Sequence, residues 1–443
     1  MAAERRNRGN SPVSPPVTRR ELFAWAMYDF ANSGYTTVVL TTIFNAYFVG
    51  VVAGGAGGLS DGAGTLLWTV AVSIPNALVL LSAPVLGAIA DHYAAKKRLL
   101  LITTTGCVLC TALLALAGPG DVKLAMGLVV LSNLTFATGE NLIAAFLPEI
   151  SPQEEMGRVS AYGWALGYLG GLAVLGLCLA YVAWAQRHGF GAAQFVPRTM
   201  LLVAAVYALA ATPTFLWLKE RAIPSSPGAG ERYLAVGFRR LRHTLAESPR
   251  FRDLFRFLIA LTIYYCGINT VVVLAAVYAQ EVMGFSTSET IVLVMVVNVT
   301  AAAGASLFGQ IQPRLGSVPT LALTLVIWSI ATILAYMSDS RAGFWVVANL
   351  VGIALGSSQS CGRALIGQFA PAARAAEFFG LWGLAGKLAA IVGPLSYGLI
   401  TYLTAGNHRL AILSTVGFFV AGLATLARVN EQRGKAAAAA FPA

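Results

Sequence analysis

Long apolar stretches follow one another along almost the whole chain, and short polar segments separate them. Leu99–Ala117 and Leu201–Leu218 are examples that contain no charged residue. An α-helix needs about 20 apolar residues to cross the hydrocarbon core of a bilayer. A transmembrane β-barrel would instead alternate apolar and polar residues over segments of about ten positions. Because the apolar runs are long and unbroken, the pattern predicts an all-α membrane protein.

The apolar stretches divide into two groups of six, so we expect twelve transmembrane helices in two pseudo-symmetric six-helix bundles. The predicted spans are 21–49, 65–90, 97–117, 122–147, 156–184 and 198–218, then 253–280, 287–311, 318–338, 342–369, 375–402 and 408–428. The predicted domains are a disordered tail (1–20), a first bundle (21–218), a linker (219–252), a second bundle (253–430) and a disordered Ala-rich tail (431–443).

The two halves resemble copies of each other. Gly87 and Leu99 correspond to Gly309 and Leu321 at one constant spacing, and Gly163 corresponds to Gly383 at nearly the same spacing. Matches between helices rich in Gly and Ala are common by chance, but a nearly constant spacing favours duplication. Internal repeats are typical of secondary transporters.

The linker between the halves contains an amphipathic pattern. Its apolar residues share one helical face and its arginines surround them; these residues are Leu234, Phe238, Leu241 and Leu245, with Arg239, Arg240 and Arg242. Such a helix would lie on the cytoplasmic leaflet. A solvated linker without helical structure is the alternative.

Composition supports a membrane protein, since only 11% of residues are charged and 57% are hydrophobic. A soluble domain carries about 25% charged residues. The net charge of +11 comes from basic residues in alternate loops. They lie in the first tail, at Lys96–Arg98, between Lys219 and Arg252, and after Arg428. This asymmetry places both termini in the cytoplasm and indicates membrane lipid, not nucleic acid, as a partner.

Reactive chemistry is not indicated. Cys107 and Cys110 form a CxxC pair inside an apolar span, where two small packing residues are the simplest interpretation. All four histidines fall outside the predicted spans or at their ends. The sequence contains no combination of residues that is typical of a catalytic site. We therefore expect no enzyme activity, no cofactor and no metal site. The predicted location is a bacterial inner (cell) membrane, and we expect a monomer.

Four charged residues stand out because they lie well inside the predicted spans: Asp29, Glu140, Arg363 and Lys387. A charge at the bilayer centre costs about 2.5–3.5 kcal/mol on insertion scales, so such residues face a cavity or a partner. Two acids lie in the first half and two bases in the second. They are candidates for substrate binding or proton coupling, and static structural ion pairs are the alternative.

Small and polar residues recur at helical spacing beside these charges. In the first span they are Asn32 or Ser33, and Thr36; in the tenth they are Gly352, Gly356, and Gln359 or Ser360. Such stripes line a cavity or pack helices closely. The pattern leaves both readings open.

Two motifs resemble known families. The segment Gly87–Arg98 (GAIADHYAAKKR) is similar to the signature loop of the major facilitator superfamily, with Gly87, Asp91 and Lys97 at the matching positions. The resemblance implies that these three residues gate the cytoplasmic side. The segment departs from the motif at His92 and Ala95, and the second-half copy has Pro313 in place of the acid.

The segment Trp25–Ser33 (WAMYDFANS) resembles the opening of the vacuolar amino-acid effluxer family linked to autophagy. Gly163–Gly171 and the Gln359–Lys387 run are similar to further parts of that family. The resemblance implies a twelve-helix permease for amino acids. Glu140 departs from the aromatic residue usual at that position of the family. From the embedded charges, the polar stripes and the motifs together, the candidate binding or coupling residues are Tyr28, Asp29, Asn32, Ser33, Glu140, Asn141, Gln359, Arg363 and Lys387.

The leading hypothesis is a secondary transporter for a small solute such as an amino acid, working by alternating access, with protons as a candidate coupling ion. Asp29 and Asn32 would hold the amine or the proton, and Arg363, with Lys387, would hold the carboxylate. A second hypothesis makes Glu140 and Arg363 a cytoplasmic gate pair. A drug or lipid exporter, and a membrane scaffold that does not transport, are the rival functions.

Overall fold

The computed structural model describes residues 17–54, 59–60, 62–92, 95–151, 156–221, 250–371 and 375–440. Within these ranges, twelve helices are long and apolar enough to cross a membrane, which confirms the predicted number of spans. The predicted linker helix and nearly all of the first tail lie outside the described residues.

The first half contains six spans. The first is built from α1 (Arg19–Tyr35), the π-helix η1 (Thr36–Thr42), α2 (Phe44–Tyr47) and the π-helix η2 (Phe48–Val52). The others are α3 (Ala63–His92), α4 (Lys96–Leu113) with η4 (Leu114–Leu116), α5 (Val122–Ala144), α7 (Met156–Arg187) and α8 (Ala192–Trp217). A short helix, α6 (Leu147–Ile150), follows α5.

The second half contains the other six spans and one terminal helix. They are α10 (Arg252–Glu281), α11 (Thr287–Leu315), α12 (Ser317–Met337), α13 (Arg341–Phe369), α14 (Ala375–Leu403), α15 (His408–Leu426) and α16 (Glu431–Ala439). Local caps fix several of these ends. Ser286 and Glu289 form a capping box before α11, and Gly316 separates α11 from α12 with a φ of +92°, a conformation that favours glycine.

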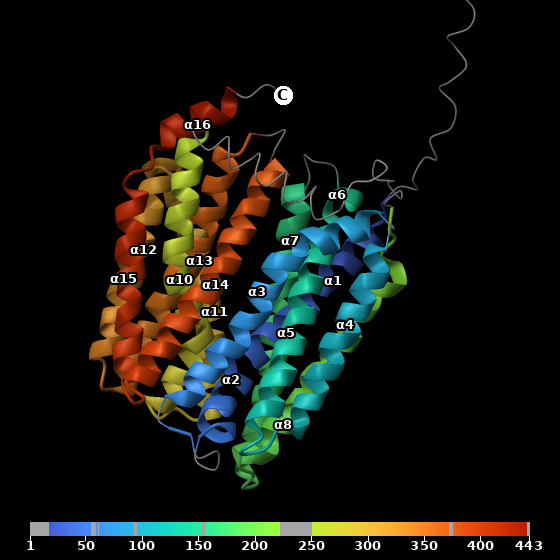
Figure 1. The fold of residues 1–443 in the computed structure, drawn as a ribbon, viewed down its shortest axis with the longest axis vertical. Helices are drawn as coiled ribbons and strands as arrows, with labels where there is room; N and C mark the ends of the chain where they lie inside the picture. The colour runs from blue at the N-terminus through green and yellow to red at the C-terminus, as the bar shows by residue number, and fades with distance from the viewer. Residues whose placement is uncertain are drawn as a thin grey trace, which may run out of the picture.

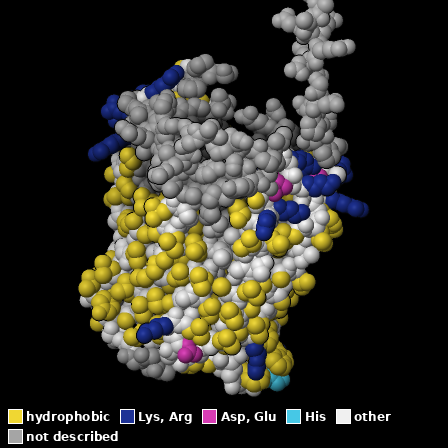
Figure 2. All heavy atoms as spheres, turned by 45° about the vertical axis from the view of Figure 1, so that its right-hand side comes forward, with side chains coloured by type: hydrophobic (Ala, Val, Ile, Leu, Met, Phe, Trp, Pro, Cys, Tyr) yellow, Lys and Arg dark blue, Asp and Glu magenta, His cyan; other side chains and the backbone are white. Residues whose placement is uncertain are grey.

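The two halves stand side by side as bundles, and α1 begins on the same face at which α16 lies (Figure 1). We call this the terminal face and the other end the opposite face. A broad band of hydrophobic side chains covers the surface between them, and Lys and Arg side chains gather towards its two ends (Figure 2). This is the surface that a bilayer-embedded protein needs. The positive-inside pattern predicts that the terminal face lies in the cytoplasm.

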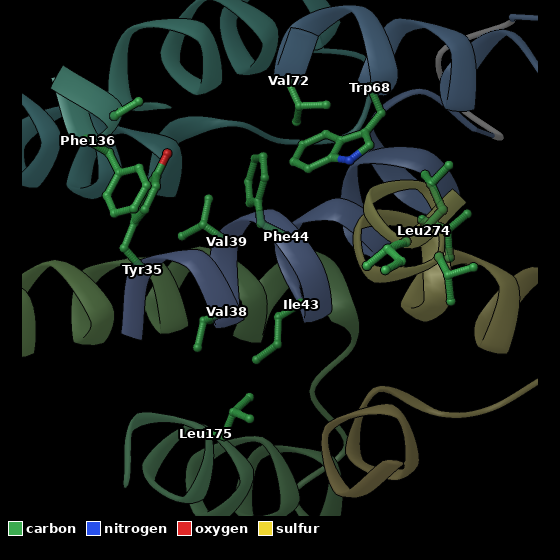
Figure 3. Close-up of a cluster of buried hydrophobic side chains, with 14 of the residues drawn as sticks. Tyr35, Val38, Val39, Ile43, Phe44, Trp68, Val72, Phe136, Leu175 and Leu274 are labelled. Carbon is green, nitrogen blue, oxygen red and sulfur yellow. The ribbon is translucent and has the colours of Figure 1, made fainter. Parts of the chain in front are cut away.

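The halves meet along a seam formed by α3 with α14, α7 with α11, and the first span with α10. Towards the opposite face, side chains bond across this seam. The Asn45 amide donates to the Val273 carbonyl at 2.9 Å, and the Ser288 hydroxyl donates to the Gln186 side chain at 2.7 Å. Phe44 and Trp68 of the first half pack in a buried cluster that Leu274 of α10 completes (Figure 3). The halves are therefore closed together on this side.

Glycines allow α1 and α7 to pack closely inside the first half. A Cβ at Gly170 would collide with the backbone of Phe30, and one at Gly167 would lie 3.0 Å from the Ser33 hydroxyl oxygen. Small residues are how membrane helices approach each other closely. Ser33 thus packs against α7.

The C-terminal segment differs from the disordered tail that the sequence predicted after residue 430. It forms α16, which folds back onto the second half. The Arg433 guanidinium donates to both carboxylate oxygens of Asp253, and the Asn430 amide N–H donates to the same carboxylate at 3.0 Å. Glu431 accepts a 2.9 Å bond from the Val318 amide at the start of α12. These polar bonds hold α16 in place, together with the packing of Gly434 against the Phe369 ring.

Replacing Asp253 by Ala is expected to release α16 and to lower the free energy of unfolding by about 1–3 kcal/mol. The Asp253 side chain is only 2% exposed, and its loss removes charge-assisted hydrogen bonds to Arg433. Thermal unfolding and the rate of limited proteolysis near residue 430 measure the two effects. Unchanged proteolysis would show that other contacts hold the helix.

Candidate functional site

Asp29 lies on α1 with its carboxylate facing α7. One of its oxygens fills the space that a Cβ at Gly163 would occupy, so the glycine makes room for the carboxylate. The side chain is half-buried. No hydrogen bond or ion pair joins the Asp29 carboxylate to another of the described residues. Such a group retains its capacity to bind a proton or a cation.

Tyr28 and Asn32, two neighbours predicted to line the site, are instead bonded inside the first bundle. The Tyr28 hydroxyl shares a 2.7 Å hydrogen bond with the Thr104 hydroxyl, and the Tyr207 hydroxyl donates to the Asn32 side-chain oxygen at 2.7 Å. Both residues are buried. These bonds position α1 against α4 and α8. A shared ligand of Asn32 and Asp29 stays a prediction.

Arg363 lies on α13 between two indole rings. Its guanidinium carbon is 4.6 Å from the ring centre of Trp164 and 5.8 Å from that of Trp382. Trp164 belongs to α7 of the first half, so its contact with Arg363 crosses the seam, whereas Trp382 belongs to α14 of the same half as Arg363. Among the described residues, no carboxylate pairs with Arg363.

Asp29 and Arg363, which have no counter-ion among the described residues, both contact α7. Asp29 contacts Gly163, and Arg363 stacks on Trp164, the next residue in the chain. Successive residues of an α-helix rise by about 1.5 Å. Asp29 and Arg363 therefore reach α7 at nearly the same depth, one from each half of the molecule.

Glu140 and Lys387 form an ion pair across the seam. The Lys387 ammonium lies 3.5 Å from the Glu140 carboxylate, and the Lys387 and Glu140 side chains are 25% and 51% exposed. The pair joins α5 of the first half to α14 of the second. The sequence suggested Glu140 and Arg363 as a gate pair, but the structure gives Glu140 a different partner because Arg363 is held between the two tryptophans.

The remaining predicted residues lie apart from this arrangement. Asn141 is exposed, and Gln359 is half-buried on α13, one turn before Arg363. The Lys97 ammonium donates to the Leu218 carbonyl at 2.5 Å, which is a contact within the first half. Gly87 and Asp91 lie in the last turns of α3, and their side chains fall outside the described part of the structure.

The sequence did not identify the aromatic residues around Arg363. Trp164 and Tyr168 are four residues apart on α7, with ring centres 6.2 Å apart, so they form one aromatic face. Trp382 packs edge-on against Tyr265 of α10. The spacing of four residues between Trp164 and Tyr168 could have predicted an aromatic helix face. It could not have predicted that this face contacts Arg363, because that contact depends on how helices of different halves pack.

The described ranges contain no group of three or more His, Cys, Asp or Glu residues that could hold a metal ion. The chemistry that the site offers is recognition of charge, with one carboxylate and one aromatic-flanked guanidinium.

Comparisons with known proteins agree on the family to which the chain belongs. Residues 63–439 match a family model described as "Vacuole effluxer Atg22 like". The chain is 29% identical over 417 residues to the "Uncharacterized MFS-type transporter YxiO" of Bacillus subtilis, covering 92% of this chain and 94% of that protein. It is 26% identical to Autophagy-related protein 22 of Yarrowia lipolytica over 334 residues, covering 69% of this chain but only 56% of the relative.

Solved structures share the fold at low sequence identity. A mutant form of the nucleoside transporter NupG superposes with a TM-score of 0.70 at 14% identity and covers 92% of this chain and 99% of that one. A D-xylose–proton symporter gives a TM-score of 0.67 at 15% identity, with 94% and 99% covered. These similarities establish the major facilitator fold for the chain.

Proposed function

Because the chain belongs to the Atg22-like vacuole effluxer family and has the major facilitator fold, we propose that it is a secondary transporter for a small zwitterion, with an amino acid as the leading candidate. The first bundle, 21–218, would rock against the second, 253–430. The bacterial cell membrane is its proposed location, since a relative from Bacillus subtilis matches it over nearly its whole length.

One observation carries this proposal: Asp29 and Arg363 approach α7 at the same depth from opposite halves, and neither has a counter-ion among the described residues. Unpaired charges within a membrane are costly, so a partner is expected. A zwitterion supplies both partners at once. Its carboxylate would accept hydrogen bonds from the edge of the guanidinium, while the indole rings keep the faces of that group covered.

The contacts at the seam are consistent with alternating access. Asn45 and Ser288 join the halves towards the opposite face, and they would separate when the molecule opens there. Glu140 and Lys387 form a single, partly exposed ion pair. A pair of this kind is weak enough to break at each cycle, since exposed ion pairs contribute only about 0.2–1 kcal/mol.

The experiment that tests the proposal is a ligand screen followed by transport. The purified protein would be heated with each of the twenty common amino acids, and then with apolar cations, nucleosides and sugars. A compound that raises the melting temperature would be tested by counterflow in proteoliposomes. Stabilisation and exchange by an amino acid support the proposal. If only apolar cations or lipids are exchanged, the protein is an exporter of the rival class.

Charge reversal at the Glu140–Lys387 pair is expected to reduce counterflow severalfold in either single variant, Glu140→Lys or Lys387→Glu. Each single variant places two like charges about 3.5 Å apart across the seam. The double reversal restores attraction and is expected to recover at least about half of the wild-type rate, because exposed pairs tolerate exchange of their charges. If the double variant is no better than the singles, the pair does not act as a unit.

A further inference from the structure

A cavity of about 150 Å³ opens on the terminal face of the second half, away from the Asp29–Arg363 site. Its walls come from the start of α10, the end of α13 and the underside of α16. Arg250, Arg252 and Arg433 supply its polar lining, and Phe251, Leu254 and Phe369 supply its apolar lining. The cavity exists because α16 folds back over α10.

Positive charge dominates this cavity. Asp253 is the acid in its lining, and its carboxylate already receives hydrogen bonds from Arg433 and from the Asn430 amide N–H. Arg252 is exposed and makes no ion pair with any described residue. The Arg250 guanidinium lies 5.9 Å from the ring centre of Phe251. Arg256, 3.8 Å from Asp253, adds a further cation beside the cavity.

The cavity lies where two of the hydrophobic spans end, the level at which a lipid headgroup is expected. Arg252 is the first residue of α10 and Phe369 the last of α13, so the hydrophobic spans end at this level. Phe251, Leu254 and Phe369 are buried and supply the apolar part of the cavity lining. A lining that combines arginines with apolar side chains matches a phospholipid, whose phosphate lies next to its acyl chains. Basic pockets between helices at this level bind anionic headgroups in membrane proteins.

We propose that this cavity binds the phosphate of an anionic phospholipid, with Arg250 and Arg252 as its principal ligands. The arginine fork is suited to bind two phosphate oxygens at once. A lipid held there would contact α10 and α16 together, and would anchor the second half at the membrane surface. The function is separate from transport and does not depend on the substrate.

The test uses the delipidated full-length protein in detergent and follows its melting temperature as lipid is added. The wild-type protein is expected to be stabilised saturably by phosphatidylglycerol and not by phosphatidylcholine. In the Arg250→Gln/Arg252→Gln variant, the apparent affinity for phosphatidylglycerol is expected to fall on the order of twentyfold, about fivefold for each arginine. Arg252→Gln alone, at an exposed position, should fold normally and lose about fivefold.

Arg198→Gln is the matched control. Its guanidinium also lies over a phenylalanine ring, 5.4 Å from the centre of Phe190, but near the start of α8 on the opposite face. Its affinity for phosphatidylglycerol should stay within about twofold of wild type. An equal loss in this control, or no loss in the Arg252→Gln variant, would overturn the proposal. If inorganic phosphate alone gives the full stabilisation at the same concentration, the ligand is free phosphate and the lipid assignment is wrong.

Discussion

Replacing Arg363 by Gln is expected to weaken binding of the transported zwitterion on the order of 100-fold and to abolish measurable counterflow at low substrate concentration. The variant removes two charge-assisted hydrogen bonds to a carboxylate, each contributing about 1.5 kcal/mol. A loss of about 3 kcal/mol corresponds to roughly two powers of ten in affinity. The loss is measured by titrating the amino acid that stabilises the wild-type protein most in the screen and recording the melting temperature at each concentration.

Two further variants separate the role of Arg363 in binding from a role in folding. Arg341→Gln is the control, because Arg341 also stacks on an aromatic ring, at 5.5 Å from the centre of Phe285, but on the opposite face. It should bind substrate normally. Arg363→Lys keeps the charge but loses the planar fork, so it should bind with intermediate affinity. If Arg363→Gln binds as tightly as wild type while folding normally, the carboxylate lies elsewhere.

The helices of this protein could be predicted from the sequence because lipid imposes a simple rule. Each span must be apolar over about 20 residues, and the twelve predicted stretches correspond to the twelve observed helices. Asp29 and Arg363 could be selected for the same reason, since charges are rare and costly in such segments. Both conclusions rest on properties of a single helix and its solvent.

The pairing of residues could not be predicted in this way. Glu140 bonds to Lys387, which is 247 positions away, and nothing within either helix specifies that partner. Asn32 lies one helical turn from Asp29, yet it turns towards Tyr207 because α8 packs against that side of α1. The order in which helices meet determines such contacts. Sequence periodicity gives the face of a helix but not the neighbour that covers it.

Helix α16 is a second case in which contacts between distant parts of the chain could not be predicted. Its Ala-rich sequence has too little apolar surface to predict packing, so disorder was the natural expectation. The buried carboxylate of Asp253 and the backbone amide of Val318 provide the bonds that order it. Both partners lie more than 100 residues earlier in the chain, at helix ends that the fold brings together.

Replacing Asp29 by Asn is expected to remove proton-driven accumulation of substrate. If one proton is carried with each substrate molecule, a gradient of one pH unit supports about a tenfold concentration ratio, since each unit is worth about 1.4 kcal/mol. Wild-type proteoliposomes should approach this ratio. The Asn variant cannot bind and release a proton, so its ratio should remain near one. Asp339→Asn, whose carboxyl is 88% exposed in the loop before α13, should accumulate substrate normally.

Counterflow in the same variant distinguishes the two roles that Asp29 could have. Exchange of substrate for substrate requires binding but no net proton movement. If Asp29 carries only the proton, the Asn variant should exchange at close to the wild-type rate, because the amide keeps the space beside Gly163 filled. If Asp29 also holds the substrate amine, exchange falls together with accumulation. Full accumulation in the Asn variant would contradict both roles, since the carboxylate would then be neither the proton carrier nor the amine ligand.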